Sequence, residues 1–518
     1  MNIYIMSANS RTVKSIKNST VALGFYFISL VTQFFSRKIF LDHLGAEVLG
    51  LNTTATNLLQ FLNLAELGIG TAVAYTLYKP FFTHDTQTIN EIVSLQGWMY
   101  RRIAYVVILA AGVLMCAFPW IFAKMPLPQW YAYASFIVLL VSALLSYFVN
   151  YKQVVLSADQ KEYKIQYSYK SSMLIKVLCQ IIAIKYFNNG YIWWLVLEVI
   201  FAVIAAVVLN YTICRTYPWL KTNIHSGREL RHKYSYITKK IKQLFFHKVA
   251  YFALTQTSQI IIYAYASLTL VAFYGNYMLI ITGITMLMGA MFNGVNGSIG
   301  NLVAEGDKKR NIAVFEELFC VRFWLTCIMC FGVYLLTPSF ITLWIGSQYL
   351  MGDSTLLLMI SIMYINLSRL TVDSYLNAYG LYQDIWAPLV EAIINVGLSI
   401  WLGYFWGLHG ILWGVLISLL LIVFCWKPYF LFKNGLKIRL INYVLLYAKH
   451  ILALLICISA VWYLQQLSYV DFTIAIMELV AYRIIIIIVF AIILFLLLYV
   501  TERGMRRFVK RFIRLIHR

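Results

Sequence analysis

The sequence predicts an all-α polytopic membrane protein with about 14 transmembrane helices, arranged as two parallel six-helix repeats that form N- and C-lobes plus two terminal helices. Of its 518 residues, 62% are hydrophobic and 12% are charged, whereas soluble domains are roughly 45–50% apolar and 25% charged. Uncharged apolar runs such as Ile484–Val500 are long enough to cross a bilayer. Basic residues gather on alternate loops. These observations exclude a soluble enzyme, a nucleic-acid-binding protein and a secreted disulfide scaffold.

Apolar segments follow one another along the whole chain, separated by short polar or proline-containing stretches. The prolines at segment ends, where a missing backbone N–H is tolerated, are Pro80, Pro126, Pro128, Pro218, Pro338 and Pro428. The first segment ends in Arg37 and Lys38 and has no small-residue cleavage site, so it is not a signal peptide. The predicted helices cover approximately 18–40, 47–76, 102–123, 131–156, 163–187, 191–214, 249–270, 274–303, 318–338, 354–378, 384–405, 408–429, 443–466 and 474–500.

The basic residues predict the orientation of these helices. The chain has 42 Lys and Arg against 20 Asp and Glu, and most of the basic residues fall on segments on the same side as the two termini. Because basic loops stay cytoplasmic, both termini are predicted to be cytoplasmic. The predicted domains are an N-lobe (1–215, helices 1–6), a basic linker (216–248), a C-lobe (249–432, helices 7–12), helices 13–14 (433–502) and a basic amphipathic tail (503–518).

The tail alternates basic and apolar residues at helical spacing. This pattern favours a helix that lies on anionic lipid headgroups, and a site for an acidic partner is the alternative. The eight cysteines lie in or beside apolar segments and indicate no disulfide framework, and the eight histidines lack metal-ligand spacing. The sequence therefore predicts no cofactor, no metal site and no catalytic residue.

Polar stripes on the spanning helices indicate both a cavity and an internal repeat. A side chain that faces lipid should be apolar, so these stripes predict a cavity or a helix contact. Residues on the stripes pair at sequence offsets of 220 to 226, and the pairs include Gln33 with Gln259, Asn57 with Thr282, Gln60 with Thr285, and Gly190 with Gly410. An even number of helices per repeat makes the halves parallel, so they can rock around a midplane site. The polar residues predicted to line the cavity are Gln33, Asn57, Gln60, Gln259, Asn293 and Asn296.

Three basic side chains at membrane depth are candidates for substrate binding. Inserting a charged side chain into the bilayer costs free energy, so such a residue commonly has a functional or structural role. Arg37 ends the first span, where a snorkelling interfacial arginine is the alternative. Lys176 lies midway along the fifth span, where snorkelling is harder, which favours a cavity. Arg369 and Asp373 share one helical face. This spacing favours an internal ion pair, and a cavity-facing pair that yields to substrate is the alternative.

Two acids inside helices, Glu66 and Glu391, are candidates for coupling to protons or cations. A hydrogen bond at a helix contact is the more common role for such a residue. Glu198 has no partner that the sequence identifies.

Three motifs near the N-terminus resemble the bacterial polysaccharide flippases, which export O-antigen and capsule repeat units. They are Leu44–Asn52 (LGAEVLGLN), Leu64–Gly70 (LAELGIG) and Leu77–Pro80 (LYKP). This family belongs to the multidrug/oligosaccharidyl-lipid/polysaccharide exporter superfamily. The resemblance covers roughly the first eighty residues and implies nothing about which glycan is carried.

The resemblance implies a flippase of the bacterial cytoplasmic membrane that moves an undecaprenyl-diphosphate-linked oligosaccharide by alternating access around a basic cavity. It implies a lipid-linked oligosaccharide substrate, membrane lipids and other polysaccharide assembly proteins as partners, and no nucleic acid. An anionic head group needs fixed positive charge in a low-dielectric cavity, which Arg37, Lys176 and Arg369 can supply. The alternatives are a cation-coupled multidrug exporter or lipid II flippase of the same fold, and a membrane enzyme. The enzyme is disfavoured because the predicted outer loops present no cluster of acids or bases.

Overall fold

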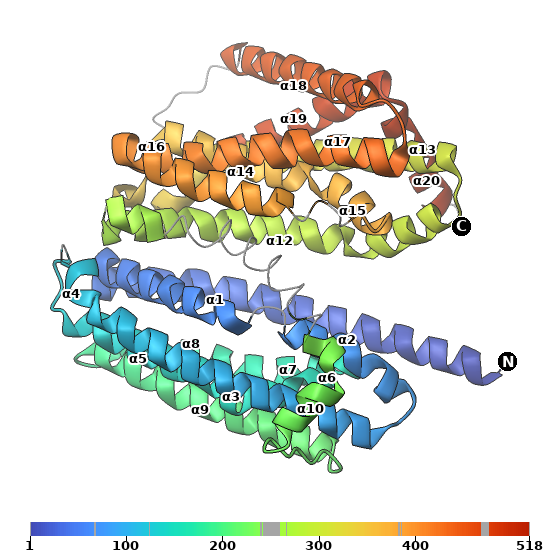
Figure 1. Ribbon diagram of the computed structural model, residues 1–518. Coiled ribbons are helices and arrows are strands. Elements are labelled where there is room, and N and C mark those ends of the chain that lie inside the picture. The colour runs from blue at the N-terminus through green and yellow to red at the C-terminus, as the bar shows by residue number, and fades with distance from the viewer. Residues whose placement is uncertain are drawn as a thin grey trace. The chain divides into compact units, whose positions relative to one another are not determined.

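The structure is a computed structural model that describes residues 2–66, 69–123, 125–238, 241, 260–265, 267–381, 384, 386–467 and 476–516. All regular elements within these ranges are helices (Figure 1). The chain forms two compact units, residues 1–272 and 273–518, called unit 1 and unit 2 below. The all-α polytopic class is confirmed. The predicted lobe, linker and tail boundaries stay a prediction.

Unit 1 is built from helices that lie side by side, with α5 and α8 both packed on α9 and on α1 (Figure 1). Its core includes Leu51, Phe118 and Tyr147, all almost fully buried. The elements are α1 (Asn2–Leu62), η1 (Asn63–Glu66), α2 (Ile69–Phe82), α3 (Thr86–Cys116), α4 (Phe118–Ile121), α5 (Trp130–Phe148), η2 (Asn150–Gln153), α6 (Val154–Ala158), α7 (Tyr163–Ile165), η3 (Gln166–Lys170), α8 (Ser171–Tyr186), α9 (Gly190–Thr216) and α10 (Gly227–Lys233).

Unit 2 is organised around α13, which packs against α14, α19 and α20. Its core includes the rings of Phe315, Phe323 and Phe490. The first residues of α12, 268–272, belong to unit 1 and the rest of this helix to unit 2. The remaining elements are α12 (Leu268–Ala304), α13 (Lys308–Trp344), η4 (Ser347–Tyr349), α14 (Asp353–Ser368), α15 (Leu370–Ala378), α16 (Trp386–Ser418), η5 (Leu419–Trp426), α17 (Lys427–Leu431), η6 (Phe432–Leu436), α18 (Ile441–Leu467), α19 (Ile476–Thr501) and α20 (Arg503–Ile516).

At two places a glycine kink lies inside one helix where the sequence predicts two separate spans. The predicted span 18–40 and the first part of the predicted span 47–76 join into α1 across Gly45, whose φ is 84°. The second part of 47–76 falls on η1 and α2. The predicted span 384–405 and the first part of 408–429 join into α16 across Gly407, whose φ is 55°. The second part of 408–429 falls on η5 and α17. Glycine adopts these conformations without a steric penalty, so the helix can bend at this residue without an intervening loop. The predicted span 249–270 lies largely outside the described residues.

The described residues contain nine helical runs that are long and apolar enough to cross a membrane. One of them, Trp386–Leu436, has 51 residues and covers two predicted spans. This is a multi-pass membrane protein. The total of about 14 spans stays a prediction.

Matching backbone landmarks in the two units support the predicted duplication. Before α3, His84 has a φ of 53°, and the side chain of Asp85 caps the helix by accepting from the backbone N–H of Thr88. Before α13, Gly306 has a φ of 77°, and Asp307 caps the helix in the same way. The two landmarks are 222 residues apart, between the offsets of 220 and 226 that the polar stripes give.

The same correspondence holds further along the chain. Gln160 and Gly380, which follow α6 and α15, both have positive φ and lie 220 residues apart. In each case a local left-handed residue sets the direction in which the following helix leaves.

Gly190 and Gly410 each let two helices of a hairpin approach closely. A Cβ on Gly190 would lie 2.9 Å from the Cα of Ile184, and a Cβ on Gly410 would lie 2.0 Å from the backbone oxygen of Leu402. We therefore expect G410A to destabilise the protein by about 1–3 kcal/mol through overpacking. Thermal unfolding in detergent measures this effect. The control is G112A, because nothing lies within 4 Å of that Cβ position. Equal stability of the two variants would contradict the assignment.

The helix α20 packs one face against α13. Met505 is fully buried, and Gly504 lies so close to α13 that a Cβ there would come within 2.6 Å of the Glu316 oxygen. Two ion pairs flank this contact: Arg507 with Glu316 at 3.2 Å and Arg511 with Glu317 at 3.0 Å. The acidic partner that the sequence left as an alternative is thus, at least in part, this chain's own α13. The exposed bases on the other face remain available for lipid headgroups.

We expect M505D to release α20 from α13, because burying a carboxylate in this apolar contact costs more free energy than the partly exposed ion pairs contribute. Faster trypsin cleavage within α20 of the purified protein measures the release. The matched control is I513D, since Ile513 is 49% exposed. If both variants are cleaved at the wild-type rate, α20 is not held by the Met505 face.

Candidate functional site

In unit 1, Lys176 is part of a polar contact that joins α8 to α9. Its Nζ donates to Glu198 Oε1 at 2.7 Å, and the two side chains are only 13% and 10% exposed. Gln180, one turn further along α8, donates to Glu198 Oε2 at 3.0 Å and to the backbone oxygen of Trp194 at 3.2 Å. Glu198 therefore has the partner that the sequence did not identify. The charge of Lys176 is compensated within its own unit.

In unit 2, Arg369 and Asp373 form the internal ion pair that their spacing predicts, with Nε and Oδ2 at 2.7 Å. Lys427 of α17 adds a second contact, with its Nζ 3.1 Å from Asp373 Oδ1. Lys427 lies 54 residues from Asp373 along the chain. The spacing of residues along the sequence therefore does not predict that Lys427 joins the Arg369–Asp373 ion pair.

Arg322 is a buried cation that sequence reasoning missed. It lies on α13 with 2% of its surface exposed, and its Nη1 donates to Ser374 Oγ at 3.2 Å and to Thr371 Oγ1 at 3.4 Å. Its guanidinium also lies over the Phe292 ring, 4.5 Å from the centroid. The sequence places it near the predicted start of a span, where an interfacial arginine is expected. The helix starts earlier, at Lys308, which moves Arg322 into the interior.

The two predicted coupling acids have different surroundings. Glu66 ends η1, and its Oε1 accepts a hydrogen bond from the Tyr100 hydroxyl at 3.0 Å. Glu391 lies on α16 with 1% of its surface exposed, and its Oε1 has no hydrogen-bond partner among the described residues. Glu391 is close enough to Arg369, Lys427 and Asp373 to interact with them electrostatically.

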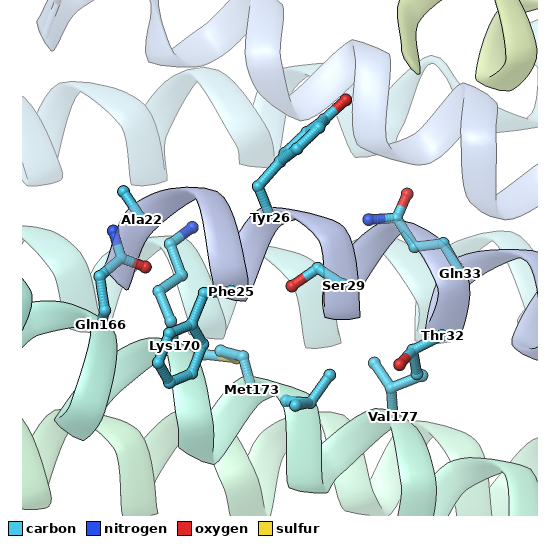
Figure 2. A pocket seen from close by; sticks show the side chains of 11 residues that line it. Ala22, Phe25, Tyr26, Ser29, Thr32, Gln33, Gln166, Lys170, Met173 and Val177 are labelled. Atoms are coloured by element: carbon cyan, nitrogen blue, oxygen red, sulfur yellow. The ribbon is translucent and has the colours of Figure 1, made fainter. Parts of the chain in front are cut away.

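A pocket of about 480 Å³ in unit 1 lies between α1 and the η3–α8 segment. Figure 2 shows Lys170 and Gln166 reaching from η3 towards α1, with Ser29 and Gln33 along α1. No acidic side chain is among the described residues that line it. The full lining is Ala22, Phe25, Tyr26, Ser29, Thr32, Gln33, Gln166, Lys170, Met173, Leu174 and Val177. We call it the α1–α8 pocket.

Lys170 supplies the positive charge of this pocket. Its side chain is exposed, and its Nζ has no hydrogen bond or ion pair within the described part of the chain. It lies seven residues into the helical run that begins at Tyr163, a rise of about 10 Å. The sequence shows Lys170 inside a predicted span but gives no reason to prefer it over Lys176. The two lysines differ because Lys176 is paired with Glu198 on a neighbouring helix. Such a pairing between helices cannot be seen in the sequence spacing.

The other predicted site residues are placed as follows. The Arg37 guanidinium donates to the backbone oxygen of Ala272 at 3.2 Å. Asn57 is buried and Gln60 is half-buried on α1. Gln259 lies outside the described residues, and so do the side chains of Asn293 and Asn296 on α12. The structure thus brings Gln33 together with Lys170, and Arg369 together with Asp373.

The described residues hold no group of three or more His, Cys, Asp or Glu side chains that could bind a metal ion. The described lining of the α1–α8 pocket offers one cation, amides and hydroxyls on an apolar and aromatic wall. Such a mixture suits binding and orientation of a ligand.

Comparisons with known proteins show the fold. No protein-family model and no curated protein matches the sequence. Among solved structures, a lipid II flippase, MurJ, in an inward closed conformation matches with a TM-score of 0.63 and 12% identity, over 91% of this chain and 98% of that one.

A multidrug resistance MATE family transporter of the MOP superfamily matches in two conformations. The inward-facing structure has a TM-score of 0.59 and 13% identity, over 81% of this chain and 99% of that one. The outward-facing structure has a TM-score of 0.55 and 12% identity, over 82% and 96%. The chain has a MATE/MurJ-like fold.

Proposed function

We propose that this protein is a flippase that moves an undecaprenyl-diphosphate-linked oligosaccharide across the bacterial cytoplasmic membrane by alternating access of two lobes. The α1–α8 pocket carries the proposal. It combines one uncompensated cation, Lys170, with amides and hydroxyls, and no acid lies among its described lining residues. Its volume of about 480 Å³ accommodates a phosphorylated sugar head group.

The chemistry of the lining suits the two parts of such a head group. An ammonium in a low-dielectric surrounding attracts a diphosphate strongly. The amides of Gln33 and Gln166 and the hydroxyls of Ser29 and Thr32 can donate to and accept from sugar hydroxyls. The apolar side chains leave room for the lipid tail to stay in the bilayer.

The compensated cations elsewhere make Lys170 the preferred candidate. Lys176 is paired with Glu198, and Arg369 with Asp373. Breaking the Lys176–Glu198 pair to bind substrate would leave a buried acid without its cation, which is unfavourable. Arg369 is likewise held by Asp373, which Lys427 also contacts. Arg37, held near Ala272, is a second candidate for phosphate contact.

We further propose Glu391 as the coupling group, because its buried carboxyl lacks a described hydrogen-bond partner for Oε1 and lies near two cations. A carboxyl in this setting can respond to protonation by changing the balance of charge around Asp373. Glu66, held by Tyr100, is the second candidate.

A multidrug exporter and a lipid II flippase remain the alternatives, since proteins of both kinds share the fold. Among the described lining residues of the α1–α8 pocket there is one cation and no acid, which favours an anionic cargo over a cationic drug.

A deletion strain tests the proposal. We expect loss of surface glycan, intracellular accumulation of undecaprenyl-diphosphate-linked oligosaccharide, and unchanged drug resistance. Raised drug sensitivity with normal surface glycan would overturn the proposal in favour of a drug exporter. Accumulation of lipid II with normal glycan would overturn it in favour of the second alternative.

A further inference from the structure

A second pocket of unit 1, of about 530 Å³, lies between α9 and the α7–η3 segment. We call it the α9 pocket. Its lining consists of Tyr163, Lys164, Tyr167, Ser168, Val208, Tyr211, Thr212, Arg215 and Thr216. It shares no lining residue with the α1–α8 pocket. The mechanism proposed above makes no use of it.

The polar half of the α9 pocket is cationic. Lys164 and Arg215 both line it, and none of the described lining residues is acidic. The Lys164 Nζ is held by a hydrogen bond to Thr216 Oγ1 at 2.9 Å. A third cation, Lys17 of α1, lies over the ring of Tyr163, 4.0 Å from its centroid. The hydroxyls of Ser168 and Thr212 and of the tyrosines add potential donors.

The apolar half continues as a stripe along α9. Val196, Ile200, Val203, Val207 and Tyr211 are spaced by three or four residues, and each has 39–64% of its surface exposed. In a membrane protein such a stripe lies against acyl chains. It runs directly into the cationic end of the pocket, because Tyr211 belongs to both.

The cationic end is on the predicted cytoplasmic side, where Lys164 begins the fifth predicted span and Arg215 follows the sixth. Basic pockets between transmembrane helices at this level bind the head groups of anionic lipids. An acyl stripe that leads to two cations and several hydroxyls matches a molecule with a phosphate attached to fatty-acid chains.

We propose that the α9 pocket binds an anionic phospholipid of the surrounding bilayer, with its phosphate between Lys164 and Arg215 and an acyl chain along the exposed stripe of α9. This site is separate from the transported cargo, and it does not depend on which substrate the protein carries. It gives the cytoplasmic end of unit 1 a fixed lipid contact.

Native mass spectrometry of the full chain in detergent, titrated with phosphatidylglycerol, tests the proposal. We expect the K164Q/R215Q variant to bind the tightest phosphatidylglycerol about thirty-fold more weakly than the wild type, which corresponds to about 1 kcal/mol for each cation. R215Q alone should lose about fivefold. Because no described hydrogen bond holds the exposed Arg215 side chain, R215Q is the variant that keeps the fold intact. The matched control is R231Q, which removes an exposed arginine on α10.

Two further titrations identify the lipid. Phosphatidylethanolamine, which is zwitterionic, should bind weakly and equally to all variants, and undecaprenyl diphosphate should bind the wild type and R215Q equally. Unchanged phosphatidylglycerol affinity in R215Q and K164Q/R215Q overturns the proposal. An equal loss in R231Q overturns it too, because the effect is then one of net charge. A loss confined to undecaprenyl diphosphate assigns the pocket to cargo and also overturns it.

Discussion

Replacing Lys170 by glutamine is expected to reduce surface glycan at least tenfold while the protein stays in the membrane at its wild-type level. Glutamine keeps most of the length of the side chain and its hydrogen-bonding capacity but removes the charge that faces the diphosphate. Since the side chain is exposed in the α1–α8 pocket and holds no described partner, its loss should leave the fold unchanged. Immunoblotting of membranes and quantification of surface glycan measure the two effects separately.

Two matched variants make this test specific. K170R keeps the charge and should retain most of the activity. K185Q removes an exposed lysine near the end of α8, the helix that follows η3 directly, and should behave as the wild type. Wild-type glycan levels in K170Q would show that Lys170 does not bind the diphosphate, and equal losses in K170Q and K185Q would show that the pocket has no special role.

The second large effect concerns the polar contact between α8 and α9. E198L leaves Lys176 buried without its counter-ion, and we expect a loss of about 3–5 kcal/mol in the free energy of unfolding. The K176M/E198L variant removes both charges and should recover most of that loss, because well-packed apolar residues replace a buried ion pair at little cost. Denaturation of the purified protein in detergent measures both.

The control for this series is E162Q, which neutralises an exposed acid near the start of the same helical run. It should change stability by less than about 0.5 kcal/mol. If E198L proves as stable as E162Q, the ion pair does not hold α8 to α9. If K176M/E198L is inactive in transport although it is stable, Lys176 acts on substrate as well.

The sequence predicted those features that depend on spacing within one helix. Arg369 and Asp373 are four residues apart, and their ion pair follows from helical geometry. Composition and the length of apolar runs predicted the all-α membrane class. The offsets of the polar stripes also agree with the positions of the capping residues Asp85 and Asp307, because a duplication keeps local turn geometry along with polarity.

Contacts between helices were beyond prediction. Lys176 and Glu198 are 22 residues apart on neighbouring helices, and their pairing depends on the rotation of α8 against α9. The π-helical segment η3 shifts that rotation just before α8 and presents Lys170 to α1. Kinks at Gly45 and Gly407 likewise depend on packing, since glycine permits a left-handed conformation without requiring it. Sequence polarity therefore identifies helices that carry polar contacts, but it does not show which cations are paired across helices.

The most direct measurement is translocation of a fluorescent undecaprenyl-diphosphate-linked oligosaccharide in proteoliposomes that contain the purified full chain. Externally added quencher reports how much of the labelled head group has moved between leaflets. The account predicts faster translocation with the wild-type protein than in protein-free vesicles, and a rate near the protein-free level with K170Q. Equal rates for the wild type and K170Q, or no translocation above protein-free vesicles, would contradict it.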